Sequence, residues 1–448
     1  MAAINRLSTQ EVMRVARQSF RQLSSKQRIE ISTLKQLFDA AVSRSVLSDE
    51  EIKDVELALL LVASTHKYCE KQLDEATKFL SLCRFLSSNL GNAVQRVVHY
   101  FTRALQERIA KESGIVISEG LESRGQILHP EQTSVGLNPA LAACSLQLPY
   151  VRVTQFTAIQ AVVENLGAAK KVHFIDLAIR SGEHCTVLMQ ALATRTDRPV
   201  ELLKITAVGT TSKDRIEATG RRLADFAETY NIPFEFKTVM VMSISKLKED
   251  MLELNEDEAV AIYFWAILRN IVVAETNGLE SLMGVLRNLK PRVMVFIDFE
   301  ANHNSPIFID RFHESLHFYS ACFDGLDICT ERADSCRNVL EDCLGQEILD
   351  VVAADDDKRA FRHMKMEDWR VYFTKLEMVE KELSMSAFYQ AELMLKNSAN
   401  GSLCSFDKND KCLIIRWRET EMLSVSAWKF RRQKRSRRSS NTTLQLFS

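Results

Sequence analysis

Five short apolar runs, separated by longer stretches, occupy the middle of this 448-residue chain. In chain order they are Val172–Leu177, Leu202–Val208, Phe234–Val239, Val260–Phe264 and Arg292–Asp298. The stretches between them, such as Lys213–Tyr230, are long enough to form crossover helices. Because neighbouring parallel strands need such crossovers, the pattern predicts a mainly parallel, doubly wound α/β sheet. Two later runs, Lys411–Trp417 and Leu423–Phe430, follow turn-forming residues and predict an antiparallel pair at the end of the sheet.

The chain before residue 165 has a different pattern, with apolar residues at helical spacing. Ser48 and Glu51 form a capping-box sequence ahead of an apolar run, and Asn92–Ala110 repeats the helical period. With only 14 glycines and 7 prolines in the whole chain, such elements can run without interruption. We therefore expect a mainly helical cap over residues 46–165 and an α/β core over residues 166–430.

The two ends of the chain differ from this central region. Residues 1–45 are expected to form an N-terminal amphipathic helical extension, because residues 8–23 place their apolar side chains on one face. Organelle transit peptides share this basic composition, although the unbroken amphipathic pattern favours a surface helix of the fold. Residues 431–448 are expected to form a disordered basic tail.

The formal net charge of −1 hides a strong asymmetry along the chain. Residues 429–448 contain no acidic side chain, and their basic residues are Lys429, Arg431, Arg432, Lys434, Arg435, Arg437 and Arg438. Such a cluster is typical of a nuclear-import signal or of an arm that contacts DNA, and a terminus that merely aids solubility is the alternative. The rest of the chain is acidic, which suits protein partners better than nucleic acid.

The loops that follow the first two apolar runs are the first places to look for a cofactor site, because doubly wound sheets bind ligands where their strands end. A dinucleotide or S-adenosylmethionine site needs several glycines in the first loop, and only Gly182 lies there. The second run ends in Gly209-Thr210-Thr211, without a carboxylate to hold ribose hydroxyls. We therefore expect no nucleotide cofactor.

Groups suited to metal binding or catalysis are few. His313 and His317 lie four residues apart on an expected helix, but no further ligands follow at a recognisable spacing. Cys185 follows His184 directly and is interpreted as a sequence neighbour rather than an arranged catalytic pair. The chain also has no apolar run near the roughly 20 residues that a membrane span requires, so no membrane partner is expected.

The ten cysteines are expected to be mostly free thiols in a reducing compartment. Four of them recur every seven residues, at Cys322, Cys329, Cys336 and Cys343. Metal sites favour close pairs, and Gly325 and Asp327 are expected to interrupt any single helix here, so we interpret the repeat as packing.

A short leucine motif is the first candidate for contact with a protein partner. Leu57, Leu60 and Leu61 match the L-x-x-L-L helix that docks into apolar grooves of transcription regulators. Leucines at these spacings also occur in helix cores, which is the more common outcome.

Several segments, taken in order along the chain, resemble the plant GRAS family of transcriptional regulators. The residues that look like its VHIID signature are Val172, His173, Phe174, Ile175 and Asp176. The residues that match its closing SAW element are Ser426, Ala427 and Trp428. The VHIID-like signature continues to Leu188–Leu192. Segments similar to the leucine-rich regions are Gly91–Phe101, Thr219–Leu223 and Asn231–Phe236, and those similar to the PFYRE region are Pro291, Glu300–Ser305 and Phe318-Tyr319.

The resemblance implies a helical cap over a Rossmann-like α/β core related to S-adenosylmethionine methyltransferases. It also implies a nuclear regulator that acts through other transcription factors and GRAS homo- or heterodimers, with promoter DNA as a further candidate partner. On this interpretation the chain is not an enzyme, and it has no cofactor and no small-molecule substrate. The alternative function is an S-adenosylmethionine-dependent small-molecule methyltransferase, which the missing glycines and ribose carboxylate disfavour.

The chain also departs from the family pattern. It resembles DELLA-like and scarecrow-like members but shows no N-terminal DELLA segment, so we do not expect hormone-triggered degradation. His184-Cys185 stands where the family usually has Gln-Trp, and Arg359–Arg362 lacks the family's acidic residue. His173, in a buried strand, and Asp176, at its end, are expected to be structural rather than ligand-binding.

Overall fold

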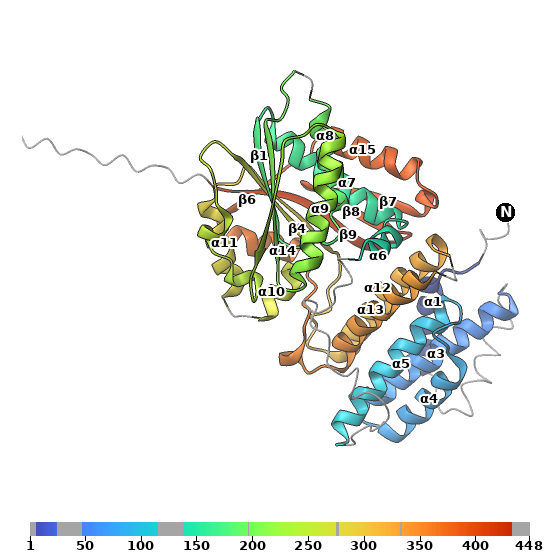
Figure 1. Ribbon diagram of the computed structural model, residues 1–448. Coiled ribbons are helices and arrows are strands. Elements are labelled where there is room, and N and C mark those ends of the chain that lie inside the picture. The colour runs from blue at the N-terminus through green and yellow to red at the C-terminus, as the bar shows by residue number, and fades with distance from the viewer. Residues whose placement is uncertain are drawn as a thin grey trace, which may run out of the picture.

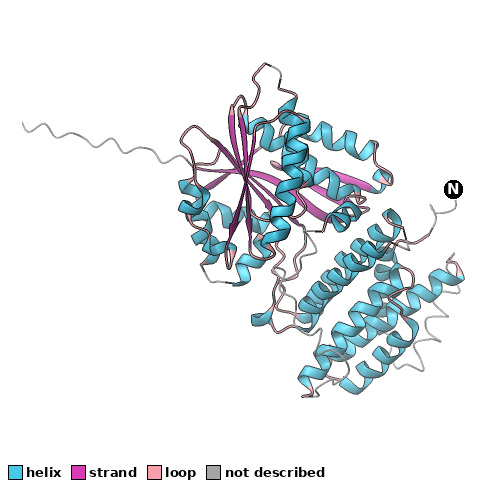
Figure 2. Ribbon diagram, viewed as in Figure 1, coloured by secondary structure: helices cyan, strands magenta, loops and turns pink. Residues whose placement is uncertain are grey.

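The computed structural model describes residues 6–24, 47–114, 138–195, 197–274, 277–331 and 334–431. In this part of the chain a bundle of long helices lies beside a twisted sheet that carries helices on both faces (Figure 1). The sheet and the bundle are clearly separate layers of secondary structure (Figure 2). None of the described helices combines the length and the apolar character that a membrane span needs.

The apolar runs in the middle of the chain are all strands, and they pair in parallel. They are β1 (Lys171–Asp176), β2 (Leu202–Gly209), β3 (Phe234–Met240), β4 (Ala259–Trp265) and β5 (Val293–Phe299). Their order in the sheet is β3-β2-β1-β4-β5, so successive strands are added on one side of β1 and then on the other. This reversal is the mark of a doubly wound sheet, and the prediction of a Rossmann-like α/β fold is confirmed.

The C-terminal strands extend the sheet in antiparallel fashion. They are β6 (Met378–Lys381), β7 (Cys404–Asn409), β8 (Cys412–Trp417) and β9 (Thr420–Phe430). Strand β9 pairs with β5, β8 and β6, which makes it the centre of this half of the sheet. The predicted antiparallel pair is therefore confirmed as β8 and β9, whereas β6 and β7 were not predicted.

Alternate residues along the strands face two separate cores. Val293, Val295 and Ile297 of β5 belong to one core, and Met294 and Phe296 belong to the other. The first core is covered by α7 (Pro149–Leu166), α8 (Glu183–Ala193), α9 (Lys213–Thr229) and α15 (Met385–Lys396). The second is covered by α10 (Leu268–Ala274), α11 (Gly278–Asn288) and α14 (Met366–Lys375). This alternation follows from the two-residue repeat of an extended chain.

The helical bundle combines segments from both ends of the chain. Its members are α1 (Thr9–Ser24), α3 (Asp49–Cys69), α4 (Leu73–Leu86), α5 (Ala93–Glu112), α12 (Phe308–Cys329) and α13 (Ser335–Ala353). The capping box that begins α3 is formed as predicted, because the Ser48 N–H donates to Glu51 at 2.8 Å and the Glu51 N–H donates to the Ser48 hydroxyl.

The sequence predicted a cap over residues 46–165 and a core over residues 166–430. This domain boundary stays a prediction, and helix packing crosses it. Helix α1 packs against α3 and α12 inside the bundle, although it was expected to be an extension. Helix α7 packs on β5 and β9, and α6 (Pro139–Ser145) packs on α13. The bundle therefore depends on helices from the C-terminal half.

Helix α12 runs without a break through Gly325 and Asp327, so the expected interruption at these residues is wrong. A side chain at Gly325 would be in ordinary contact with Tyr150, 3.4 Å away, which shows that the helix is closely packed at this point. The carboxylate of Asp327 is held by two arginines, which compensates for its weak helix propensity.

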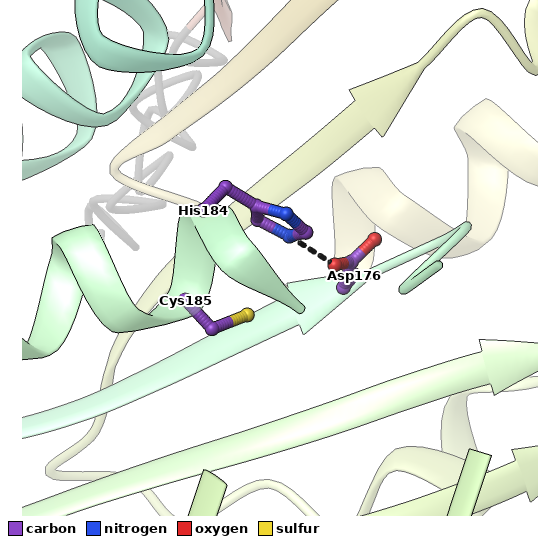
Figure 3. A group of neighbouring side chains, drawn as sticks. All are labelled: Asp176, His184 and Cys185. Atoms are coloured by element: carbon purple, nitrogen blue, oxygen red, sulfur yellow. Dashed lines mark hydrogen bonds and ion pairs between the residues drawn. The ribbon is translucent and has the colours of Figure 1, made fainter. Parts of the chain in front are cut away.

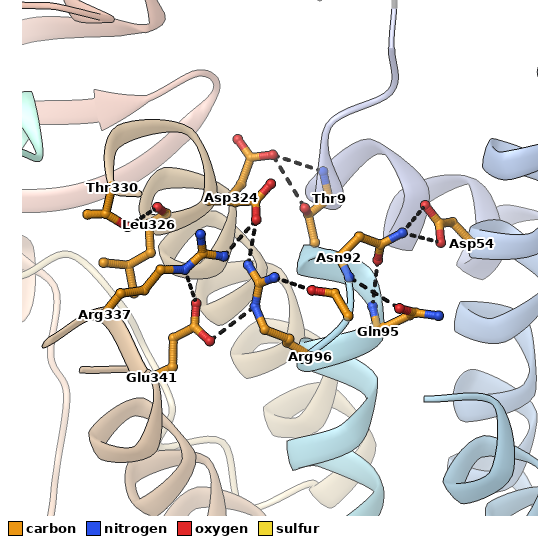
Figure 4. Close-up of polar contacts among 12 residues, drawn as sticks. Thr9, Asp54, Asn92, Gln95, Arg96, Asp324, Leu326, Thr330, Arg337 and Glu341 are labelled. Atoms are coloured by element: carbon orange, nitrogen blue, oxygen red, sulfur yellow. Dashed lines mark hydrogen bonds and ion pairs between the residues drawn. The ribbon is translucent and has the colours of Figure 1, made fainter. Parts of the chain in front are cut away.

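A buried ion-pair network holds three bundle helices together (Figure 4). Glu341 on α13 lies 3.0 Å from Nε of Arg96 on α5 and 2.9 Å from Nε of Arg337 on its own helix. Both arginines also donate to Oδ1 of Asp327 on α12, at 2.7 Å. The side chains of Arg96, Arg337 and Glu341 are almost fully buried, so this network fixes how α5, α12 and α13 pack.

A second buried carboxylate connects the bundle to the sheet. Oδ1 of Asp324 on α12 accepts from the backbone N–H and the hydroxyl of Thr9, at 3.2 and 3.3 Å. Its Oδ2 accepts from Nε1 of Trp417 at 2.8 Å and from Nε of Arg418 at 2.9 Å. Asp324 therefore joins the start of α1, the middle of α12 and the turn between β8 and β9.

Candidate functional site

A cavity of about 390 Å³ lies where the parallel strands end. Its walls come from the loops after β1, β2, β3 and β4, from the end of β5, from the α6–α7 segment, and from α12 and α13. Most of the lining side chains are apolar, and Leu177, Ile244, Trp265 and Leu344 are typical. This is the position at which doubly wound sheets bind their ligands, so the crevice is the first candidate for a functional site.

The aspartate of the VHIID-like motif lies at the edge of this crevice and is fully engaged. Oδ1 of Asp176 accepts from the N–H of Ala178 at 2.9 Å, and Oδ2 lies 2.5 Å from Nε2 of His184 (Figure 3). The His184 ring stacks on Tyr263 of β4, with ring centres 4.5 Å apart and planes at 6°. Asp176 has no exposed surface, so its carboxylate clamps the loop between β1 and α8 rather than facing the crevice.

His184 and Cys185 were interpreted as sequence neighbours rather than an arranged catalytic pair, and the structure brings both side chains close to Asp176. Both project from the first turn of α8 toward Asp176, and the three side chains place ligand-type atoms within 4.8 Å of one another. Burial disfavours the charged form of His184, but Cys185 and Asp176 outweigh it and raise the pKa of His184 well above its ordinary value. Burial raises the pKa of the Cys185 thiol, which has no exposed surface and is therefore no accessible nucleophile.

The histidine of the motif is also satisfied inside the protein. Nδ1 of His173 lies 3.1 Å from Glu258, and Nε2 lies 2.7 Å from the hydroxyl of Thr206 on β2. Burial, together with the nearby charge of Lys204, lowers the pKa of His173 to about 4. The other motif residues, Val172, Phe174 and Ile175, are fully buried in the two cores. These contacts are those of a structural strand, and a ligand-binding role of the motif has no support in them.

The crevice does not fit a dinucleotide or S-adenosylmethionine. Gly182 is the single glycine of the first loop, and its positive φ of 83° places it at the start of α8 as a turn residue. At the end of β2, a side chain at Gly209 would meet Ile216 at 2.2 Å, so this glycine permits close helix packing. Thr210 and Thr211 follow where a ribose-binding carboxylate would be required.

The leucine motif lies inside the bundle. Leu57, Leu60 and Leu61 of α3 are 4%, 5% and 0% exposed and belong to the main core. A docking helix must present its leucines to a partner, and these are already packed against their own chain. We therefore do not retain α3 as a partner helix.

The SAW-like residues lie in the middle of the sheet. Ser426, Ala427 and Trp428 of β9 pair with β5, and all three are buried. The indole Nε1 of Trp428 donates to the Ser426 hydroxyl at 2.9 Å, and its ring packs on Phe373 of α14. In this structure the motif holds the antiparallel half of the sheet to α14.

The basic cluster begins at the end of β9. Lys429 and Arg431 are exposed, and the N–H of Arg431 donates to the carbonyl of Glu377 at 2.9 Å. Five of the predicted basic residues lie outside the described residues, namely Arg432, Lys434, Arg435, Arg437 and Arg438. The import or DNA-contact role of the cluster stays a prediction.

Sequence reasoning missed the far wall of the crevice. Cys322 on α12 and Cys343 on α13 both line the cavity, together with Glu347, which binds Arg269 at 2.8 Å. All ten cysteines are free, as expected. The seven-residue cysteine repeat indicated that the side chains of these two helices pack together. It did not predict that the helices lie over the ends of the strands.

The doubly wound sheet and the helical bundle define a Rossmann-like α/β protein, and its described strand-end loops lack the glycine-rich turn and the ribose carboxylate of a nucleotide site. The sequence profile of the GRAS domain family matches residues 57–429. The chain belongs to the GRAS domain family.

Similar proteins agree with this assignment. DELLA protein GAI1 of Vitis vinifera is 30% identical over 394 residues, which cover 86% of this chain and 63% of that protein. DELLA protein GAI of Arabidopsis thaliana is 31% identical over 389 residues, or 86% of this chain and 70% of that protein. The chain thus spans less than two thirds of the grapevine relative. The crystal structure of SCL7 in Oryza sativa has a TM-score of 0.73 and 25% sequence identity, covering 83% of this chain and 99% of that one.

Proposed function

We propose that this chain is a plant transcriptional regulator that acts in the nucleus through contacts with transcription factors and with other GRAS proteins, as homo- or heterodimers. The observation that carries the proposal is the family match over residues 57–429, because it includes both the bundle and the sheet. Relatives at 30% and 31% identity over most of the chain support the same class of protein.

The chemistry of the described strand-end loops is in keeping with a regulator. The VHIID-like aspartate is tied to Ala178 and His184, and the described strand-end loops offer neither a glycine-rich turn nor a ribose carboxylate. The methyltransferase alternative therefore has no support from the crevice.

The bundle carries the exposed apolar surface on which a partner can dock. Phe85 and Leu86 at the end of α4 and Leu90 in the following turn are 85%, 45% and 76% exposed. Large apolar side chains gathered on a surface favour contact with another protein, and a partner's amphipathic helix fits such a ridge. We call these three residues the α4 patch and propose that it contacts a transcription factor.

The basic residues that begin at Lys429 are proposed to serve nuclear import, and promoter DNA is a further candidate partner. The end of β9 presents Lys429 and Arg431 to solvent, so the cluster begins at an accessible point on the surface. An import signal must be reached by its receptor, and a short, highly basic run suits this role.

Partner capture from plant nuclei tests the proposal. The unaltered chain should recover transcription factors, and a double variant of the α4 patch, Phe85→Glu with Leu90→Glu, should lose them and lose output from a reporter gene. Met242→Glu is the matched control, because Met242 is 93% exposed in the other half of the molecule. Recovery of no transcription factor by the unaltered chain contradicts the function, whereas equal recovery by all variants contradicts only the α4 patch.

A further inference from the structure

The crevice cavity has no part in the function proposed above. It measures about 390 Å³, which lies within the range of cavities that bind small molecules. Its walls join the two halves of the molecule, since strand-end loops form one side and α12 with α13 form the other. A well-packed protein leaves few voids larger than a water molecule, so an apolar space of this size calls for an occupant.

Arg180 brings an unpaired positive charge to this cavity. Its guanidinium lies over the Trp265 ring, 5.1 Å from the ring centre, and both side chains line the cavity. Its side chain makes no ion pair and no hydrogen bond with another residue in the described part of the chain. Its backbone is held in the left-handed region, with φ of 51°, which is uncommon outside glycine. The carboxylates of Glu183 and Asp176 favour its charge from nearby, but neither forms an ion pair with it. A half-buried guanidinium without a direct ion pair is suited to an anionic ligand group.

Arg269, the other arginine that lines the cavity, already has hydrogen-bond partners within the protein. Nη2 of Arg269 donates to Glu347 at 2.8 Å, and Nη1 donates to His363 at 2.7 Å. Beside it, Oδ1 of Asn270 is buried and accepts no hydrogen bond. A buried acceptor without a donor costs free energy, but this atom has almost no surface that a ligand could reach. Among the charged side chains of the described lining, Arg180 is therefore the one without an ion pair.

We propose that the cavity binds an apolar carboxylic acid, whose carboxylate pairs with Arg180 and whose body fills the space between the strand ends and α13. The ligand touches both halves at once, since Leu340 and Leu344 come from α13 while Leu177 and Ile244 lie beside the strand ends. Its binding therefore stabilises the contact between bundle and sheet. This effector site is independent of the regulatory function proposed above.

Calorimetry on the full chain tests the site with two probes that differ only in their polar group, dodecanoate and 1-dodecanol. We expect dodecanoate to bind one molecule per chain and at least about 10-fold more tightly than the alcohol, because a charge-assisted contact is worth roughly 1.5–3 kcal/mol. Arg180→Gln should remove this preference and leave the alcohol's affinity unchanged, and Arg180→Lys should restore part of it. Leu344→Trp should weaken both probes by filling the cavity.

Arg221→Gln is the matched control, because Arg221 is an exposed arginine on nearby α9 that does not line the cavity. It should bind both probes like the unaltered chain. Thermal unfolding of each variant without probe shows that the fold is intact, and dodecanoate should raise the midpoint of the unaltered chain but not that of Leu344→Trp. The proposal is overturned if dodecanoate does not bind, if it binds no better than the alcohol, or if Arg180→Gln retains the preference.

Discussion

Nε2 of His184 lies 2.5 Å from Oδ2 of Asp176, although eight residues and a turn separate them in the sequence. This contact joins the last residue of β1 to the first turn of α8 and is fully enclosed by Tyr263 and the neighbouring strands. The carboxylate at the end of the first strand thus makes its hydrogen bonds within the protein. The same contact gives the aspartate of the VHIID-like motif a structural role in the described fold.

Asp176→Ala should destabilise the chain by about 3–5 kcal/mol, because it leaves His184 and the N–H of Ala178 buried without a partner. Chemical denaturation gives the free energy of unfolding. Asp257→Asn is the matched control, since Asp257 is exposed and pairs with Lys171 at the surface. It should change stability little. Equal effects of the two substitutions would show that the clamp is not structural.

Glu341→Gln should also cost about 3–5 kcal/mol, because the buried Arg96 and Arg337 would keep only the exposed Asp327 as a carboxylate partner. Glu201→Gln removes a carboxylate from an exposed pair with Lys170 and should cost less than about 1 kcal/mol. Both are measured by denaturant unfolding. A Glu341 variant as stable as the Glu201 variant would mean that the network does not hold α5 to α13.

Asp324→Asn should loosen α1 before it affects the sheet. The substitution places an amide N–H₂ among the donors of Thr9, Trp417 and Arg418, so at least two of these contacts are lost. Hydrogen exchange should rise first in residues 9–24. Glu419→Gln, which removes an exposed pair between Arg14 and the β8–β9 turn, is the control and should leave this exchange unchanged. If hydrogen exchange in residues 9–24 is unchanged in both variants, α1 is held to the bundle by its apolar face and not by Asp324.

Asp298 makes stability depend on pH. Burial raises the pKa of Asp298 to about 7, so between its ordinary value near 4 and about 7 the folded chain holds a proton that the unfolded chain releases. Stability from this group is therefore lost as the pH rises through that window. Asp298→Asn should be more stable than the unaltered chain near pH 8, and the difference should shrink toward about pH 5. A difference that does not vary with pH, in thermal unfolding at both values, would contradict this assignment.

Deletion of residues 432–438 tests the basic cluster and spares β9, which ends at Phe430. If the cluster is an import signal, a fluorescent fusion should lose nuclear accumulation and regain it with an unrelated import signal attached. If the cluster contacts DNA, the deletion should weaken promoter binding and flatten its dependence on salt, because fewer counterions are released. A deleted chain that still enters the nucleus and binds DNA with the same salt dependence would leave the cluster without either role.

Elements specified by local patterns could be predicted from the sequence. The five parallel strands are short apolar runs between helices, and the start of α3 follows from Ser48 and Glu51 alone. Strands β6 and β7 were not predicted. Strand β6 has only four residues, and β7, Cys404–Asn409, is half-exposed and polar. Neither shows the alternation or the apolar run that identifies a strand.

Features that depend on distant contacts could not be predicted. The bundle places α12 and α13 beside α5, more than 200 residues away, and the far wall of the crevice arises from this packing. The expected break at Gly325 was wrong because tertiary contacts of Tyr150, Arg96 and Arg337 outweigh local helix propensity. Arg180 was not recognised either, since only the folded loop shows that its charge has no partner.

The most direct test is a calorimetric titration of the full chain with S-adenosylmethionine. It measures whether this GRAS chain binds the cofactor of the methyltransferases that share its fold. With Asp176 held by His184 and no ribose carboxylate after β2, we expect no saturable binding up to about 1 mM. Stoichiometric binding in the micromolar range would contradict this interpretation and return the methyltransferase alternative to first place.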